Sequence, residues 1–242
     1  MKNSIPLIWQ SKTFILLFFG FVFFTVIGTL THECGHYLVA RYLGCLGGRI
    51  SYGYTFSGKN ENGELLRKIQ KQYPTEIRNG IDFPGKKEFE VAQEKYSKDN
   101  FKIEAGGPLE SILTGTIGLT LLLVLKKKFL DATELNLWQW LIVLITLFWL
   151  RGLFNFVDRF GFYLITGFKP IGSDEFNLSA YLGLGTWTIS LVSAIIGTLI
   201  LIYVVFTIIP IRQRFTFLCA GLSGGITGVI LWLGIVGPRI MP

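Results

Sequence analysis

The stretch that decides the fold of this chain is THECGHYLVARYLG, Thr31 to Gly44. It follows an apolar run, Phe14 to Leu30, that carries no charge. The chain has two histidines, His32 and His36, and both stand in this stretch in the pattern H-E-x-x-H. On a helix, residues four apart lie on one face, so both imidazoles can reach the same metal ion. The sequence therefore predicts one long helix that is anchored in lipid by its first half and carries a chemical site in its second half.

The composition indicates an integral, multi-pass membrane protein. Of 242 residues, 50% are hydrophobic, and the mean hydropathy of +0.49 is too high for an ordinary soluble domain of this size. About 20 helical residues cross the hydrocarbon core of a bilayer. Lipid offers no hydrogen-bond partners, so the backbone N–H and C=O groups of such a segment must bond to one another within a helix. Five segments are long and apolar enough to be such helices: Thr13 to about Ala40, Pro108 to Leu125, Leu137 to Phe156, Trp187 to Ile209, and Phe215 to Val236.

The charges and cysteines exclude several other classes of protein. The net charge of +7 comes partly from basic clusters beside membrane segments, at 126–128 and 212–214, which is typical of anchoring and not of nucleic-acid binding. The first apolar run is too long for a cleaved signal and lacks a small-residue cleavage pattern, so we expect it to be retained. Cys34, Cys45 and Cys219 show no disulfide or thiolate–zinc spacing.

The chemistry typical of H-E-x-x-H is zinc-dependent hydrolysis. His32 and His36 would bind the metal, and Glu33 would act as the general base on a water that the metal activates. A catalytic zinc takes three protein ligands, and since no third histidine exists, the third ligand must be a carboxylate or, less favoured, a cysteine. Outside the polar insert the acidic candidates are Glu104, Glu110, Asp131, Glu134, Asp158, Asp174 and Glu175. Asp158 and Asp174 are the two strongest, because both follow the third apolar segment in a stretch too apolar for a solvated loop.

A polar insert, residues 57–100, separates the first two apolar segments. Its helical stretches are broken by Pro74, Gly80, Pro84 and Gly85, and we expect it to be solvated and partly ordered. At its edges Ile50, Tyr52, Tyr54 and Phe56 alternate, as do Phe101, Ile103 and Ala105. This alternation predicts two short strands at the membrane boundary that pair as a hairpin, with the insert as its loop.

The last two apolar segments carry small residues at helical spacing, Gly221 with Gly225 and Gly224 with Gly228. Such spacing favours close helix contact and indicates no chemistry of its own. The chain therefore divides into a zinc-site membrane core, 1–185, and two C-terminal membrane helices, 186–242. The expected fold class is an all-α polytopic membrane protein with about five membrane helices, a re-entrant or interfacial segment and a short β-hairpin.

Four segments, in the same order, resemble the site-2 protease family of intramembrane zinc metalloproteases. HECGHYLVARYLG resembles the zinc-binding helix of that family, and AGGPLES, at 105–111, resembles its Ala-Gly-Pro segment. LFNFVD, from Leu153, is similar to its Phe-Asn-Leu-Leu-Pro run, and SDEFNLSAYLGL, from Ser173, to the segment that supplies the aspartate ligand. The resemblance covers about the first 185 residues, excluding the insert at 57–100. It departs from the family at Ser111, Glu175 and Asp158, which stand where the family has asparagine, glycine and proline.

The resemblance implies that His32, His36 and Asp174 bind zinc, with Glu33 as the general base and Asn155 in the substrate channel. Asp174 is then favoured over Asp158, although the longer spacing between the Asn155 and Asp174 segments keeps Asp158 as a rival. The family cleaves a helix of another membrane protein, which must unwind, so Tyr52 and Tyr54 on the predicted strand become candidate substrate-binding residues.

The leading hypothesis is thus a zinc-dependent endopeptidase whose partners are the lipid bilayer and a membrane-protein or membrane-anchored peptide substrate. Two alternatives stay open. One is a membrane protein that binds or transports zinc without cleaving, and the other is a membrane zincin outside the site-2 family with a different third ligand.

Overall fold

The computed structural model describes residues 5–168 and 172–242, and within them the chain is almost entirely helical. In this described part, five helices are long and apolar enough to cross a membrane, which is consistent with the expected all-α polytopic fold. They are Ser11–Tyr42, Lys86–Val124, Leu137–Thr166, Thr188–Ile208 and Arg214–Ile240.

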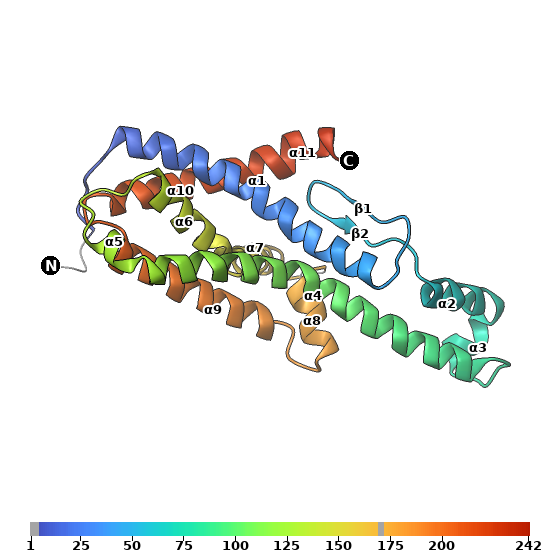
Figure 1. Cartoon of the computed structure of the whole chain (residues 1–242). Coiled ribbons are helices and arrows are strands. Elements are labelled where there is room, and N and C mark those ends of the chain that lie inside the picture. The colour runs from blue at the N-terminus through green and yellow to red at the C-terminus, as the bar shows by residue number, and fades with distance from the viewer. Residues whose placement is uncertain (1–4, 169–171) are drawn as a thin grey trace.

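Shorter elements connect and extend these helices (Figure 1). The described elements, in chain order, are α1 (Ser11–Tyr42), β1 (Arg49–Ile50), β2 (Thr55–Phe56), α2 (Glu61–Gln72), α3 (Pro74–Asn79), α4 (Lys86–Val124), α5 (Lys126–Leu130), α6 (Leu137–Thr146), η1 (Leu147–Trp149), α7 (Leu150–Thr166), α8 (Asp174–Tyr181), α9 (Thr188–Tyr203), η2 (Val204–Ile208), α10 (Arg214–Val229), η3 (Ile230–Val236) and α11 (Gly237–Ile240).

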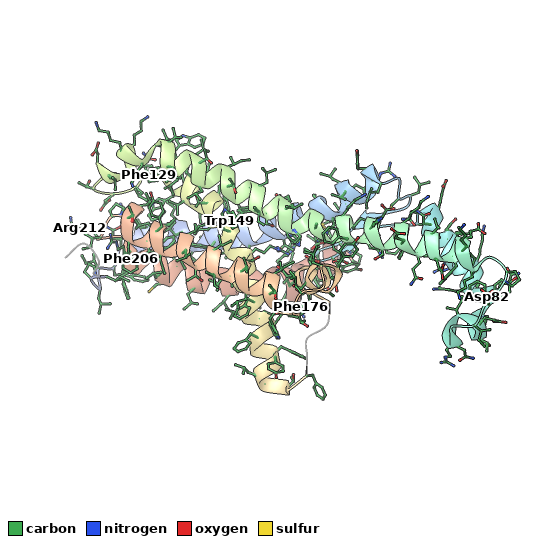
Figure 2. The ribbon with its side chains drawn as sticks, turned by 90° about the horizontal axis from the view of Figure 1, so that it is seen from below. Asp82, Phe129, Trp149, Phe176, Phe206 and Arg212 are labelled. Carbon is green, nitrogen blue, oxygen red and sulfur yellow. The ribbon has the colours of Figure 1, made fainter. Side chains whose placement is uncertain are left out.

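The molecule is elongated, with an apolar bundle at one end and the polar insert at the other (Figure 1). Phe129 and Phe206 lie near the bundle end, and Asp82 lies at the tip of the insert (Figure 2). The main apolar core, which includes Leu17, Leu122 and Phe217, fills the bundle between α1, α4 and α10. The polar insert therefore projects beyond the bundle from the end opposite to the start of α1.

Helix α1 packs closely on two neighbours, α10 and α4, at positions where glycines stand. Along its first half, Gly224 and Gly228 of α10 lie against Phe18 and Thr25 so closely that a Cβ would overlap them. Along its second half, Gly35 meets Gly106 of α4 at backbone distance. Of the two predicted spacings, Gly224 with Gly228 thus marks a helix contact, whereas nothing lies within 4 Å of a Cβ on Gly225.

The polar insert is ordered as α2, α3 and the first turns of α4. Leu66, Ile69, Phe83 and Phe89 form a small separate apolar cluster beneath it. Pro74 opens α3, and the left-handed glycines Gly80 and Gly85 end α3 and precede α4, so the expected breakers do punctuate these helices.

The prediction of a strand over Phe101–Ala105 was wrong, because these residues lie within α4. Their alternation is also compatible with a helix that is buried on two sides: Ile103 packs with Ala40 and Cys45, while Phe101 stacks on Tyr181 of α8. A run of five residues is too short for its period to separate the two structures when the surrounding helix is long.

A hairpin does form, but from the other predicted strand folded on itself. β1 and β2 pair antiparallel, with Arg49 opposite Phe56 and Ile50 opposite Thr55. Tyr52 and Tyr54 therefore lie in the connecting turn, so the prediction that both lie on one face of a continuous strand was wrong.

The C-terminal segment holds this turn in place. Ser51 Oγ and the Tyr52 amide donate to the Met241 carbonyl at 2.7 and 3.1 Å, and Trp232 Nε1 donates to the Tyr52 carbonyl at 2.7 Å. The last helix thus supports both α1 and the hairpin beside it.

The third membrane helix is longer than its apolar core, because α6, η1 and α7 continue it to Thr166. Helix α7 has no buried residue and projects from the bundle (Figure 2). Residues 169–171 lie outside the described part, and the chain then enters the short helix α8, which carries Asp174 and packs against α4 and α9.

Candidate metal centre

The site is built where α1 and α4 cross. Because Gly35 and Gly106 have no side chains, the two backbones approach until a Cβ on either glycine would overlap the other helix. One residue along α4, Gly107 faces the imidazoles, and a Cβ there would overlap both His36 Nε2 and His32 Nε2. The space next to the two ring nitrogens therefore exists because residue 107 is a glycine.

Three ligand atoms converge in that space. His32 Nε2 lies 2.9 Å from Asp174 Oδ2, His36 Nε2 lies 3.3 Å from the same oxygen, and the two Nε2 atoms are 3.2 Å apart. Ligands of a tetrahedral zinc, each about 2.0–2.2 Å from the metal, stand about 3.3 Å from one another. Within the described residues, His32, His36 and Asp174 are the one group of three or more such side chains that can hold a metal ion.

Each imidazole is oriented through its other nitrogen. His36 Nδ1 is 2.6 Å from the Ile103 carbonyl, so its N–H donates there and leaves the Nε2 lone pair free. His32 Nδ1 is 3.1 Å from Ser111 Oγ. Such partners fix the tautomer and ring position of metal-binding histidines. Ser111, which departs from the resembled motif, is therefore in direct contact with a candidate ligand.

Asp174 reaches the histidines from the first turn of α8. Burial disfavours its charged form, but the hydrogen bonds with His32 and His36 outweigh burial and hold the pKa of this carboxyl well below its usual range. The carboxylate form is the one that binds metal.

The other aspartate considered from sequence, Asp158, is not brought to the histidines. Its side chain is 58% exposed and its carboxylate lies 3.6 Å from Arg159 Nε on the projecting helix α7. Asp158 lies outside the His32, His36 and Asp174 group and outside the cavity that these three line.

Glu33 stands beside the ligand group without belonging to it. Its side chain is buried, and Thr55 Oγ1, from strand β2, lies 3.0 Å from Glu33 Oε2 and 2.8 Å from the Glu33 carbonyl. The hairpin thus reaches the glutamate through one threonine. A carboxylate held next to a metal position and facing a cavity has the placement that a general base requires.

Glu175, next to Asp174, is held by two donors. Asn155 Nδ2 donates to Glu175 Oε1 at 2.8 Å, and Ser173 Oγ donates to Glu175 Oε2 at 2.6 Å. Glu175 is buried, so the network ties the base of α7 to the turn that presents Asp174. Asn155, predicted in the substrate channel, does line the cavity, and its amide is engaged with Glu175.

The three candidate ligands, together with Glu33 and Glu175, line a cavity of about 270 Å³. Its described lining includes four carboxylates, Glu33, Glu104, Asp174 and Glu175, and two guanidinium groups, Arg151 and Arg159. When all six are ionised their charges sum to −2, which a divalent cation would neutralise. Two imidazole nitrogens and one carboxylate oxygen at these distances, in a cavity of this charge, fit a zinc ion.

Tyr54 lines the same cavity and is half-exposed, whereas Tyr52 is turned toward the C-terminal helix. Sequence reasoning did not single out Arg151, whose Nη1 donates to the Gly28 carbonyl at 3.2 Å and whose Nε has no partner among the described residues. A charged residue inside an apolar segment was the signal that could have found it. Nothing in the sequence around Thr55 or Gly107 indicated that these residues contribute to the site.

Comparison of this chain with protein-family models, with curated proteins and with solved structures finds no match. The case for a function therefore rests on the site itself.

Proposed function

We propose that this protein is a zinc-dependent endopeptidase that cleaves peptide bonds of membrane-protein or membrane-anchored substrates within or near the bilayer. The observation that carries the proposal is the convergence of His32 Nε2, His36 Nε2 and Asp174 Oδ2 within 2.9–3.3 Å of one another, beside an acid that is not one of them. Non-hydrolytic zinc sites have no need of such an acid.

In this proposal His32, His36 and Asp174 hold the ion, and Ser111 and the Ile103 carbonyl keep the imidazoles in place. When bound, zinc supplies a Lewis acid that polarises a peptide carbonyl and lowers the pKa of a water. Glu33 would take one proton from the attacking water and give it to the leaving amine as the peptide C–N bond breaks, while the hydroxyl group stays on the carbonyl carbon. Thr55 Oγ1 lies 3.0 Å from Glu33 Oε2 and restrains this carboxylate.

The resemblance of four segments to the site-2 protease family agrees with this assignment, and the membrane setting is supported by the five apolar helices. We therefore propose a divergent member of that family. The departures at Ser111 and Glu175 both fall on residues that contact or adjoin the candidate ligands, which fits a site that keeps the ligands and alters their supports.

The test is Glu33→Gln in the purified full chain. We expect bound zinc to stay at the wild-type level and peptide hydrolysis to fall by about 100- to 10,000-fold, the usual contribution of a general base. Hydrolysis is measured on membrane-anchored peptides and zinc by elemental mass spectrometry. Full retention of hydrolysis would overturn the proposal, and zinc binding without hydrolysis by the wild type would favour a zinc-binding or transport protein.

A further inference from the structure

A second cavity lies next to the metal cavity on the side of the polar insert and shares three lining residues with it. It has a volume of about 500 Å³ and lies between the hairpin, α2 and α4. Thr55, Ser57 and Ile103 line both cavities, so the two meet along the same edge of the hairpin. We call this second cavity the insert groove.

The lining of the insert groove differs from that of the metal cavity. Its walls carry the polar side chains of Arg67, Gln70 and Asn100, and its floor carries apolar groups such as Leu66 and Ile103. Arg67 and Gln70 are exposed, so the groove is open to solvent on the α2 side. Mixed walls of this kind suit a peptide, whose main chain needs polar partners while some side chains need apolar contact.

The position of the metal cavity along α1 explains why a peptide would continue into this groove. At about 1.5 Å per residue, the 21 steps from Ser11 to His32 span about 32 Å, close to the thickness of the hydrocarbon core of a bilayer. A bilayer that α1 enters at its first turn would therefore place the candidate metal centre at the membrane boundary on the side of the polar insert.

We propose that the insert groove binds the polar segment that flanks the scissile bond of a membrane-anchored substrate, on the aqueous side. The inference rests on the proposed function and adds the substrate class: a bond at the membrane boundary, followed or preceded by an extended polar flank. An extended peptide advances about 3.3 Å per residue. A few residues beyond the metal cavity, the extended substrate must therefore leave the lipid. The insert groove is the space that adjoins the metal cavity on that side.

The experiment uses two probes with the full-length Glu33→Gln chain in detergent, so that a bound peptide is not cut. The first probe is a pool of synthetic peptides with one apolar span of about 20 residues and a randomised polar flank that carries a photo-crosslinker. The second has the same span and no flank. Crosslinked positions are mapped by mass spectrometry, and affinity is measured by fluorescence anisotropy.

Two substitutions on α2 are compared, Gln70→Trp, which fills the groove, and Gln72→Trp, which makes the same change outside its lining. We expect crosslinks at groove residues such as Gln70, Tyr96 and Asn100. Gln70→Trp should weaken binding of the flanked pool about tenfold, as loss of an important contact does. It should leave the flank-free peptide unchanged, and Gln72→Trp should alter neither.

Crosslinks elsewhere, no binding of the flanked pool, or equal affinities of the two Trp variants would overturn the groove inference. If the zinc-loaded wild type then still cut the span peptides in a Glu33-dependent way, the proposed function would stand without the groove. Groove crosslinking with no hydrolysis by the wild type would overturn the proposed function and show a peptide-binding site alone.

Discussion

The two halves of α1 make the same kind of contact with opposite consequences. In the first half, Gly224 and Gly228 of α10 let that helix press against Phe18 and Thr25, and the contact is apolar packing. In the second half, Gly35 and Gly106 let α4 approach just as closely, and the contact contains two histidines and a glutamate. Glycine spacing therefore indicates where helices meet, and the side chains beside the glycines decide whether the meeting place can do chemistry.

Gly107→Ala gives the sharpest test of that difference. The added Cβ would occupy the space beside both Nε2 atoms, so we expect loss of zinc binding in a protein that is still helical. Zinc content and circular dichroism measure the two properties. Gly225→Ala is the control, since nothing lies within 4 Å of a Cβ there. Wild-type zinc content in Gly107→Ala would contradict the assignment of the site.

Asp174→Ala should lower zinc affinity by more than about 100-fold, beyond the range seen when only a supporting residue is lost. The physical reason is that Asp174 supplies one of three convergent ligand atoms. Competition with a zinc chelator measures the change. Asp158→Ala, an exposed aspartate on α7, serves as the matched control and should leave affinity unchanged. The opposite ranking would make Asp158 the third ligand.

Glu175→Ala should lower zinc affinity by less than Asp174→Ala does. Removing the carboxylate frees Asn155 and Ser173 and loosens the turn that presents Asp174, so we expect a fall in zinc affinity of about 10- to 100-fold. The same chelator competition applies, with the exposed Glu94→Ala as control. An unchanged affinity would show that the network only packs α7 against α8.

Gly224→Ala tests the apolar half of α1. A Cβ there would meet the Phe18 carbonyl and the Phe21 side chain, so we expect destabilisation of about 1–3 kcal/mol, as in overpacked cores. Thermal unfolding in detergent measures this loss. Zinc affinity of the folded fraction should equal that of the wild type, and a marked fall in that affinity would mean that the two halves of α1 are coupled.

Much of the fold followed from hydrophobic length alone, because an apolar run of about 20 residues has few alternatives to a helix. The expected helix breaks in the insert at Pro74, Gly80 and Gly85 were also confirmed. Proline fixes φ at the start of a helix, and glycine adopts the left-handed conformation at its ends. The strand over Phe101–Ala105 failed because five alternating residues carry too little information against a helix of 39 residues.

For the site, the sequence singled out His32, Glu33 and His36 by their spacing, and it narrowed the third ligand to two aspartates. It did not show the partners that orient these groups, Ser111, Thr55 and the Ile103 carbonyl, because such contacts join segments far apart in the chain. Nor did it show that Asn155 is bonded to Glu175.

The sequence by itself determined that this chain forms apolar helices and that one of them bears two imidazoles and a carboxylate on neighbouring positions. Both properties depend on the spacing of residues along a helix and on the free energy of transferring side chains and backbone into lipid, and both can be estimated from the sequence. Only the tertiary structure decided which acid meets the imidazoles, since Asp174 lies 142 positions from His32. That meeting depends on α8, which packs against α4 and α9 and carries Asp174. It also depends on the close approach of α1 and α4, which the absence of side chains at Gly35, Gly106 and Gly107 permits.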